Sequence, residues 1–300
     1  MQLLTEPLSP SLQRECPAKI NLRLAVLGKR EDGYHDLSSI VAPISLYDRL
    51  EAEWLQGDKP DTLSIPNSDL DPGESNLVTR ALQAFRAAYP FPGHLKTTLR
   101  KAIPSGAGLG GGSSDAAGML LLLQEMWGDP LKGAELKAIA TKLGADVPFS
   151  LASTTALMRG IGDELTLLPE LHDKLKDAKL FIFKPSFGIS TAWAYKALAE
   201  HSAYQDASTE EALLSAALAG GSPFKQLPFN AFRHVADRRF PTLPVLLEKL
   251  QSSFSVTLEM SGSGSACFTA YTCEEEWQKM EHMVKEAWGE TAFCEKVHVV

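Results

Sequence analysis

The sequence has few cysteines, and they show no metal-binding arrangement. Cys16, Cys267, Cys273 and Cys294 form neither a CxxC pair nor a close metal-ligand spacing, and the seven histidines include no HExxH pair. Zinc modules and disulfide-rich secreted scaffolds are therefore excluded, because their cysteines recur at short spacings. We expect reduced thiols and a cytoplasmic location.

Long apolar runs and an excess of basic residues are also missing. No apolar stretch approaches the roughly 18 residues of a membrane helix, and residues 1–10 lack a signal-peptide pattern. The chain has 29 Lys and Arg against 37 Asp and Glu, a formal net charge of −8. Since nucleic acids and anionic membranes attract basic surfaces, we expect neither as a partner. A chain of 300 residues, 44% hydrophobic, predicts one large or two medium globular domains.

What the sequence does contain is one glycine-dense stretch, residues 103–127, which reads IPSGAGLGGGSSDAAGMLLLLQEMW. A backbone with few Cβ atoms can turn its N–H groups towards an anion. Ser113, Ser114 and Asp115 can cap a helix, and the apolar run 116–127 follows them. The start of a helix adds unpaired N–H donors and a positive dipole end. The stretch predicts a phosphate-binding loop before a buried helix, with a plain glycine linker as the alternative.

Two common phosphate loops do not fit this stretch. It lacks Gly-Lys-Ser/Thr, so it is not a Walker P-loop. Residues 106–111 satisfy GxGxxG, but a dinucleotide fold also needs a second strand that ends in an acidic residue about 20 residues further on. Helical sequence fills that interval, which leaves a dinucleotide oxidoreductase as a remote alternative.

The elements before the glycine stretch follow from alternation and turn residues. Alternation from Ala18 to Val26 predicts a half-buried strand with Lys19 and Asn21 side by side on its polar face. Asp32-Gly33 favours a turn. Further strands are expected over 37–46, 49–54 and 94–101, and Asn76 is expected to cap a helix over 77–88.

The elements after it are mixed. We expect a helix over 134–143 stopped by Gly144, then a lone Asp146 in GADVPF, and strands over 155–158 and 178–183. Ser190 or Thr191 can cap a helix that contains Trp193 and Tyr195, and a further helix is expected over 209–219. The order strand–loop–strand–helix–strand over residues 255–300 predicts a separate α+β half, with a boundary near residue 155.

Four sequence blocks carry a resemblance to a known family. They are PAKINLRLAVLGKREDGYH (17–35), PSGAGLGGGSSDAA (104–117), GADVPF (144–149) and SGSGSACF (261–268). The glycine block resembles the ATP loop of the GHMP kinases, and the four together resemble the 4-diphosphocytidyl-2-C-methyl-D-erythritol kinases of the non-mevalonate isoprenoid pathway. The resemblance implies an α+β fold of two domains, 1–155 (ribosomal-protein-S5-like, with the ATP loop) and 156–300 (ferredoxin-like), and an active-site cleft between them.

The resemblance also implies ATP-dependent phosphorylation of the 2-hydroxyl of diphosphocytidyl-methylerythritol. Asp146 matches the catalytic aspartate and Lys19 the catalytic lysine. A carboxylate can accept the proton of the attacking alcohol, and an ammonium group stabilises the developing charge. Without the resemblance, Asp146 reads as a turn residue and Lys19 as a solvated strand lysine. Mg²⁺ is expected with ATP, because the triphosphate charge must be neutralised, but no ligand for it is assigned.

The binding residues follow from the same matching. The residues assigned to the ATP phosphates are Pro104, Ser105, Gly106, Ala107, Gly108, Leu109, Gly110, Gly111, Gly112, Ser113 and Ser114, with Lys101 and Asn76 towards the nucleotide. Tyr34 and His35 match the cytidine-recognising pair, and Tyr195 is expected to complete this pocket, with Phe187 and Trp193 as weaker candidates. Asn21 and Thr191 are expected to bind substrate hydroxyl or phosphate groups. The loop 261–265 is expected to lie under the glycine loop, with a plain tight turn as its alternative.

One residue departs from the superfamily pattern. Asp115 stands where alanine is general, and a carboxylate near a triphosphate is unfavourable. We expect Asp115 to cap the helix and point aside. A kinase for another alcohol, such as homoserine or mevalonate, and a nucleotide sensor without catalysis stay open as alternatives. A monomer and a homodimer are both compatible with the sequence.

Overall fold

The computed structural model describes residues 4–201, 204–220 and 222–300, which form two compact units interleaved along the chain. The first unit comprises Leu46–Ile103, Gly110–Ser153 and the described residues up to Ala18; the second comprises Lys19–Ser45, Pro104–Leu109 and the described residues from Thr154 onwards. Strands β1 (Ser11–Lys29) and β2 (His35–Leu55) run through both units. Both units are discontinuous in sequence. The division into two continuous domains, 1–155 and 156–300, stays a prediction.

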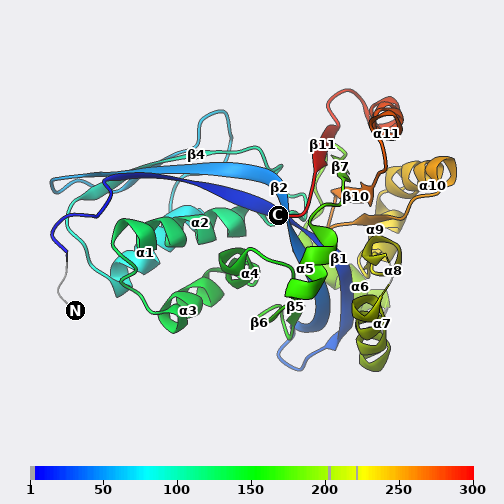
Figure 1. Ribbon diagram of the computed structural model, residues 1–300, viewed down its shortest axis with the longest axis horizontal. Coiled ribbons are helices and arrows are strands. Elements are labelled where there is room, and N and C mark those ends of the chain that lie inside the picture. The colour runs from blue at the N-terminus through cyan, green and yellow to red at the C-terminus, as the bar shows by residue number, and fades with distance from the viewer. Residues whose placement is uncertain (1–3, 202–203, 221) are drawn as a thin grey trace. The chain divides into compact units, whose positions relative to one another are not determined.

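The first unit is a sheet with helices on one face. Strand β4 (His94–Arg100) pairs antiparallel with the later part of β2 and parallel with β3 (Thr62–Ser64). The helices are α1 (Leu77–Ala88), α2 (Gly111–Met126), α3 (Gly133–Leu143) and α4 (Val147–Ala152). Figure 1 shows α1, α2 and α3 on the same face of β2 and β4. Helix α2 is apolar on nearly all sides, as a helix packed between a sheet and other helices requires.

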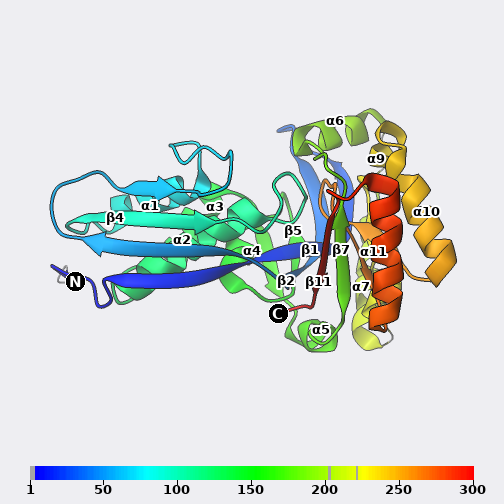
Figure 2. The ribbon, with the colours of Figure 1, turned by 90° about the horizontal axis from the view of Figure 1, so that it is seen from above.

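The second unit contains a four-stranded antiparallel sheet in the order β11-β7-β10-β9. Its strands are β7 (Leu180–Lys184), β9 (Leu258–Met260), β10 (Cys267–Ala270) and β11 (Phe293–Val297). Helix α10 (Thr242–Phe254) precedes β9, and α11 (Glu274–Trp288) connects β10 to β11. In Figure 2, α11 lies against one face of this sheet. This arrangement is ferredoxin-like, so the predicted α+β class and the predicted C-terminal order are confirmed.

The second unit also contains the later part of β1, from Lys19 on, and the earlier part of β2, up to Ser45. Strand β5 (Ala156–Arg159) pairs with β2 and with β6 (Glu164–Leu167), and β8 (Phe229–Asn230) pairs parallel with β1. The helices are α5 (Pro169–Leu175), α6 (Thr191–His201), α7 (Ala207–Ala219), α8 (Pro223–Gln226) and α9 (Arg233–Arg239). In the described part of the chain, none of the helices is both long and apolar enough to cross a membrane.

Candidate nucleotide and substrate site

The first half of the glycine stretch, Pro104–Leu109, lies on the loop 261–265 within the second unit. The Ser261 hydroxyl donates to the Gly108 carbonyl over 3.0 Å, and the Ala266 N–H donates to the Ala107 carbonyl over 3.0 Å. The Lys19 N–H donates to the Leu109 carbonyl over 2.9 Å. The prediction that the second glycine-serine loop supports the first is therefore confirmed.

Two glycines make this close contact possible. Gly108 has a φ of +77°, and a Cβ there would lie far inside contact distance of the Ser261 carbonyl oxygen. Gly262 has a φ of +56°, and a Cβ there would lie 2.9 Å from the Gly108 carbonyl oxygen. Both the left-handed backbone and the lack of space exclude larger residues.

The second half of the glycine stretch begins helix α2 in the first unit. Gly110, with a φ of +70°, is the N-cap, and no side chain caps this helix. The expectation that Ser113, Ser114 or Asp115 caps it is therefore wrong, because the helix starts earlier and places all three inside its first turns. A Cβ on Gly112 would meet only Leu77 Cδ1, at 3.6 Å, so packing does not require glycine there. An uncapped helix start with a bare glycine fits an anion, whose oxygens would accept the first N–H groups.

Helices α1 and α3 bring two further predicted residues close to this start. Asn76 caps α1 as predicted, its Oδ1 accepting from the Val78 N–H over 3.0 Å and its Nδ2 donating to the Asp71 carbonyl over 2.9 Å. A Cβ on Gly144, just after α3, would lie 4.0 Å from Ser113 Oγ. Asp146 follows two residues later at the start of α4, half-buried. The first unit therefore places the ends of α1, α2 and α3 together.

The Lys101 ammonium is held between two carboxylates in the first unit. It pairs with Asp48 and, over 2.6 Å, with Asp115. Asp115 is thus a buried ion-pair partner, which moves it away from the uncapped N–H groups as the sequence predicted, although not as a cap. Asp48 was missed by the sequence reasoning; its signal is a lone carboxylate inside the largely apolar strand segment ISLYDRL (44–50).

Lys19 and Asn21 lie side by side in the second unit, which confirms that part of the prediction. Lys19 Nζ donates to Asn21 Oδ1 over 2.6 Å, and Asn21 Nδ2 donates to Ser39 Oγ over 2.8 Å. Ser39 Oγ in turn donates to the Arg23 carbonyl over 2.8 Å. Lys19 is only 5% exposed, so the alternative of a solvated strand lysine is wrong. The strand is buried on both faces, and the network fixes the position of the ammonium group.

The residues expected at the cytidine base also lie in the second unit. The rings of His35 and Tyr195 have centroids 5.1 Å apart, and Tyr34 is 61% exposed. Phe187 and Trp193 pack instead against Phe240, with centroids 4.9 Å and 5.8 Å away.

His35 and Thr191 show two different polar environments. The Nε2 atom of His35 is buried without a hydrogen-bond partner among the described residues. Burial, with a smaller contribution from Lys29, lowers the pKa of His35, so the ring is neutral and its polar edge can take a ligand group. Thr191 Oγ1 lies 2.8 Å from Ser263 Oγ, which attaches the start of α6 to the supporting loop.

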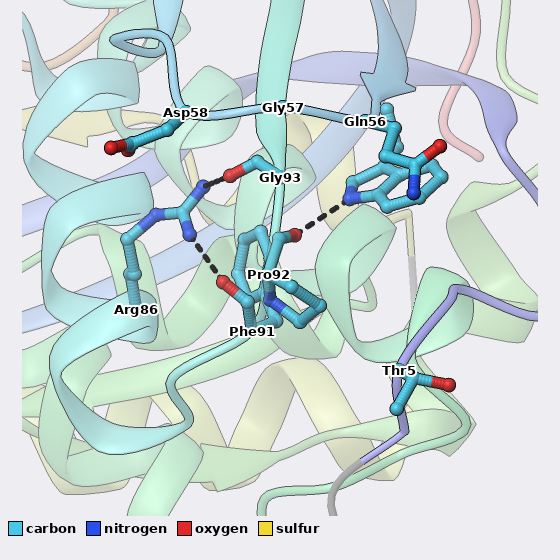
Figure 3. Close-up of a pocket in the computed structure, with 9 residues that line it drawn as sticks. Thr5, Gln56, Gly57, Asp58, Arg86, Phe91, Pro92 and Gly93 are labelled. Carbon is cyan, nitrogen blue, oxygen red and sulfur yellow. Dashed lines mark hydrogen bonds between the residues drawn. The ribbon is translucent and has the colours of Figure 1, made fainter.

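The first unit also contains a pocket of about 430 Å³, lined by Thr5, Trp54, Gln56, Gly57, Asp58, Arg86, Phe91, Pro92 and Gly93. Figure 3 shows Arg86 donating to the Phe91 and Gly93 carbonyls. Its remaining donors bind Asp61, and its guanidinium lies 3.8 Å from the centre of the Phe91 ring. None of the predicted site residues lines this pocket, and Arg86 serves the local structure. Across the described residues, no group of three or more His, Cys, Asp or Glu side chains is arranged to hold a metal ion.

Comparisons with known proteins agree on one family. Residues 76–154 match the model of the GHMP kinases N terminal domain. A 4-diphosphocytidyl-2-C-methyl-D-erythritol kinase of Pelotomaculum thermopropionicum is 38% identical over 84% of this chain and 86% of its own. One of Porphyromonas gingivalis is 39% identical over 84% of this chain and 89% of its own.

Solved structures give the same result at the level of the fold. The crystal structure of a 4-(cytidine 5'-diphospho)-2C-methyl-D-erythritol kinase is 34% identical with a TM-score of 0.76, covering 96% of this chain and 100% of its own. A mevalonate kinase of L. major, 14% identical with a TM-score of 0.72 over 99% of this chain and 98% of its own, shares the fold.

Proposed function

Because the chain belongs to the 4-diphosphocytidyl-2-C-methyl-D-erythritol kinases, a branch of the GHMP kinases, we propose that it phosphorylates the 2-hydroxyl of 4-diphosphocytidyl-2-C-methyl-D-erythritol. ATP is the phosphoryl donor, and the products are the 2-phosphate and ADP. The reaction belongs to the non-mevalonate isoprenoid pathway.

The observation that carries the proposal is the glycine stretch. Helix α2 starts without a side-chain cap, and Gly112 has no packing reason to be glycine. Both features are accounted for by a bound triphosphate, whose oxygens would accept N–H bonds from Gly111, Gly112 and Ser113. ATP supplies the γ-phosphoryl group, and we propose that Pro104–Ser114 holds its phosphates.

Asp146 is the proposed general base and Lys19 the proposed electrostatic partner. A carboxylate accepts the hydroxyl proton as the oxygen becomes a nucleophile. The Lys19 ammonium stabilises the charge that develops on oxygen, and its hydrogen bond to Asn21 fixes its position before the substrate binds.

His35, Tyr34 and Tyr195 are the proposed cytidine-binding residues. The unpartnered Nε2 of His35 supports this role, because an unpaired buried nitrogen is costly unless a ligand pairs with it. The Tyr195 ring lies next to the His35 ring, whereas Phe187 and Trp193 pack on Phe240. We therefore favour Tyr195 as the aromatic residue that completes the cytidine pocket. Asn21 and Thr191 are proposed to contact the hydroxyl and phosphate groups of the substrate, and Asn76 and Lys101 to lie on the nucleotide side.

Magnesium and the cellular setting are proposed on general grounds. Mg²⁺ often keeps its waters and binds mainly to nucleotide phosphates, so it does not need a protein cage. We propose Mg²⁺-ATP as the form used, a monomer or homodimer, no nucleic-acid partner, and a cytoplasmic location, where ATP is supplied and all four thiols stay free. We also propose that the chain divides, as the family resemblance implies, into the continuous domains 1–155 and 156–300.

The test is ADP release from Mg²⁺-ATP, with and without the diphosphocytidyl substrate. Asp146→Asn is expected to lose about 10²- to 10⁴-fold in turnover while still binding ATP, because only proton transfer is removed. Asp129→Asn, at an exposed turn after α2, is the matched control and should keep wild-type turnover. If folded, ATP-binding wild type released no substrate-dependent ADP, or released it with homoserine or mevalonate instead, the proposal would be wrong.

A further inference from the structure

The glycine stretch leaves the first unit at Ile103 and re-enters it at Gly110. The two flanks touch, because a Cβ on Gly111 would lie 3.0 Å from Ile103 Cγ2 and 3.3 Å from Lys101 Nζ. The six residues between them, Pro104–Leu109, therefore start and finish at nearly the same place. The conformation of such a loop depends on how firmly its two flanks are joined.

Three charged side chains join these flanks. On β2, Asp48 is fully buried, and its Oδ1 accepts the N–H groups of Ala102 and Ile103 over 2.6 Å and 2.9 Å. Its other oxygen pairs with Lys101 Nζ. Lys101 Nζ reaches across to Asp115 Oδ2, over 2.6 Å, in the early turns of α2. Asp48 thus holds the incoming flank, Asp115 belongs to the outgoing flank, and Lys101 connects them.

We propose that Asp48, Lys101 and Asp115 are positioning residues that hold both flanks of the glycine loop in its ATP-binding conformation. This inference rests on the proposed function, namely that the loop holds ATP phosphates. The three side chains act through the backbone of residues 102–103 and through the start of α2. Their loss should therefore weaken ATP binding more than it slows the chemical step.

The charge of this cluster supports the inference and adds a second readout. Burial raises the pKa of Asp115 to about 7, with Lys101 opposing the shift and Asp48 adding to it. Asp115 Oδ1 is buried without a partner among the described residues. Besides Asp48 and Lys101, the Cys16 thiol on β1 faces this cluster, and burial raises its pKa so that it stays neutral. The cluster therefore passes from net neutral to a charge of −1 as pH rises through about 7, and a bound polyanion favours the neutral form.

The first experiment measures the affinity for a non-hydrolysable ATP analogue by calorimetry, together with kcat and both KM values. Asp115→Ala is expected to weaken ATP binding about tenfold, with kcat within about twofold of wild type, because one flank is released. Asp115→Asn keeps an acceptor for Lys101 and should restore affinity to within about threefold. The matched control is Gln124→Leu, which removes a buried polar side chain from the far end of the same helix, where it binds the Leu131 backbone. It should lower Tm without changing ATP affinity.

A folded Asp115→Ala with wild-type ATP affinity would overturn the inference while leaving the proposed function intact. An equal loss of ATP affinity in Gln124→Leu would also overturn the inference, because the weaker binding would then result from general destabilisation of the protein. A wild type that binds no adenine nucleotide would overturn the proposed function, and this inference with it.

The second experiment does not depend on Asp115→Ala folding. Wild-type affinity for the analogue should fall more steeply than that of Asp115→Asn as pH rises from about 6 to about 8, because only wild type gains the cluster charge. Titration of the nucleotide itself is common to both proteins and cancels in the comparison. Parallel pH profiles would count against the positioning role.

Discussion

The hydroxyl of Ser261 donates a 3.0 Å hydrogen bond to the carbonyl of Gly108, joining two loops that are 153 residues apart in sequence. The same Ser261 hydroxyl accepts the Asn21 N–H over 3.1 Å. One side chain therefore connects the glycine loop, its supporting loop and strand β1. This junction tolerates no added atom at residue 108, where a Cβ would collide with the Ser261 carbonyl oxygen.

Gly108→Ala should therefore destabilise the protein. The left-handed φ and the forced movement of a backbone carbonyl together predict a loss of about 3 kcal/mol in the free energy of unfolding. Chemical denaturation measures it. Gly133→Ala, in the first turn of α3 with no atom near its Cβ, is the control and should leave the protein as stable as wild type or slightly more stable. Equal stability of the two variants would contradict the steric argument.

Gly112→Ala should have the opposite effect on stability. A Cβ there makes only ordinary contact with Leu77 at 3.6 Å, and alanine favours a helix by about 0.5–1 kcal/mol. The added methyl would stand where the phosphates are proposed to approach, so KM for ATP should rise about tenfold. Thermal unfolding and ATP titration measure the two effects. A more stable variant with unchanged KM would argue against phosphate contact at this residue.

Asn21→Leu should lower kcat because it removes the acceptor that holds Lys19 Nζ. A displaced catalytic group of this kind costs roughly 10- to 100-fold, while KM for ATP should stay near wild type. Steady-state kinetics separate the two values. Ser39→Ala removes only the outer bond of the same network and should cost much less. Similar losses in the two variants would show that the network has a structural role alone.

His35→Phe should keep the packing against Tyr195 and remove a buried nitrogen without a partner. We expect unchanged or slightly higher stability near pH 7 and a KM for the diphosphocytidyl substrate raised about tenfold.

The pH dependence of stability gives a further check on His35. Since burial lowers its folded-state pKa below the usual 6.5, wild type should lose stability relative to His35→Phe as pH falls below about 6.5, and the two profiles should run parallel above it. Parallel profiles across the whole range, with unchanged KM, would contradict the assignment.

Local signals in the sequence predicted the elements that local physics determines. The bounds of α1 and its Asn76 cap were confirmed, because capping and helical periodicity lie within a dozen residues. The adjacency of Lys19 and Asn21 was confirmed because alternation along a strand is local as well. The prediction that residues 261–265 support the glycine loop rested on the family resemblance and not on residue spacing.

The features that were not predicted depend mainly on contacts between residues that lie far apart in the sequence. The burial of Asp115 depends on Lys101 and Asp48. The sequence shows Asp48 only as a lone carboxylate in a strand segment and does not indicate that it pairs with Lys101. Helix α9 and helix α10 were missed. Helix α10 begins after Pro241 and has no side-chain cap, so the usual start signal is missing from the sequence. The passage of β1 and β2 from one unit to the other was not predicted either, because a strand that continues smoothly gives no local sign of it.

The interleaving of the two units has a consequence for synthesis on the ribosome. In the second unit, Arg23 of β1 pairs with Phe229, and Ile44 of β2 forms a bridge to Val299. Strand segments made early therefore stay unpaired until these partners, much later in the sequence, have been made. The contacts that complete this unit have high sequence separation, which makes folding slow and leaves apolar strands exposed meanwhile. We therefore expect the nascent chain to need chaperones that hold the unpaired strands until residues 229–299 have been made.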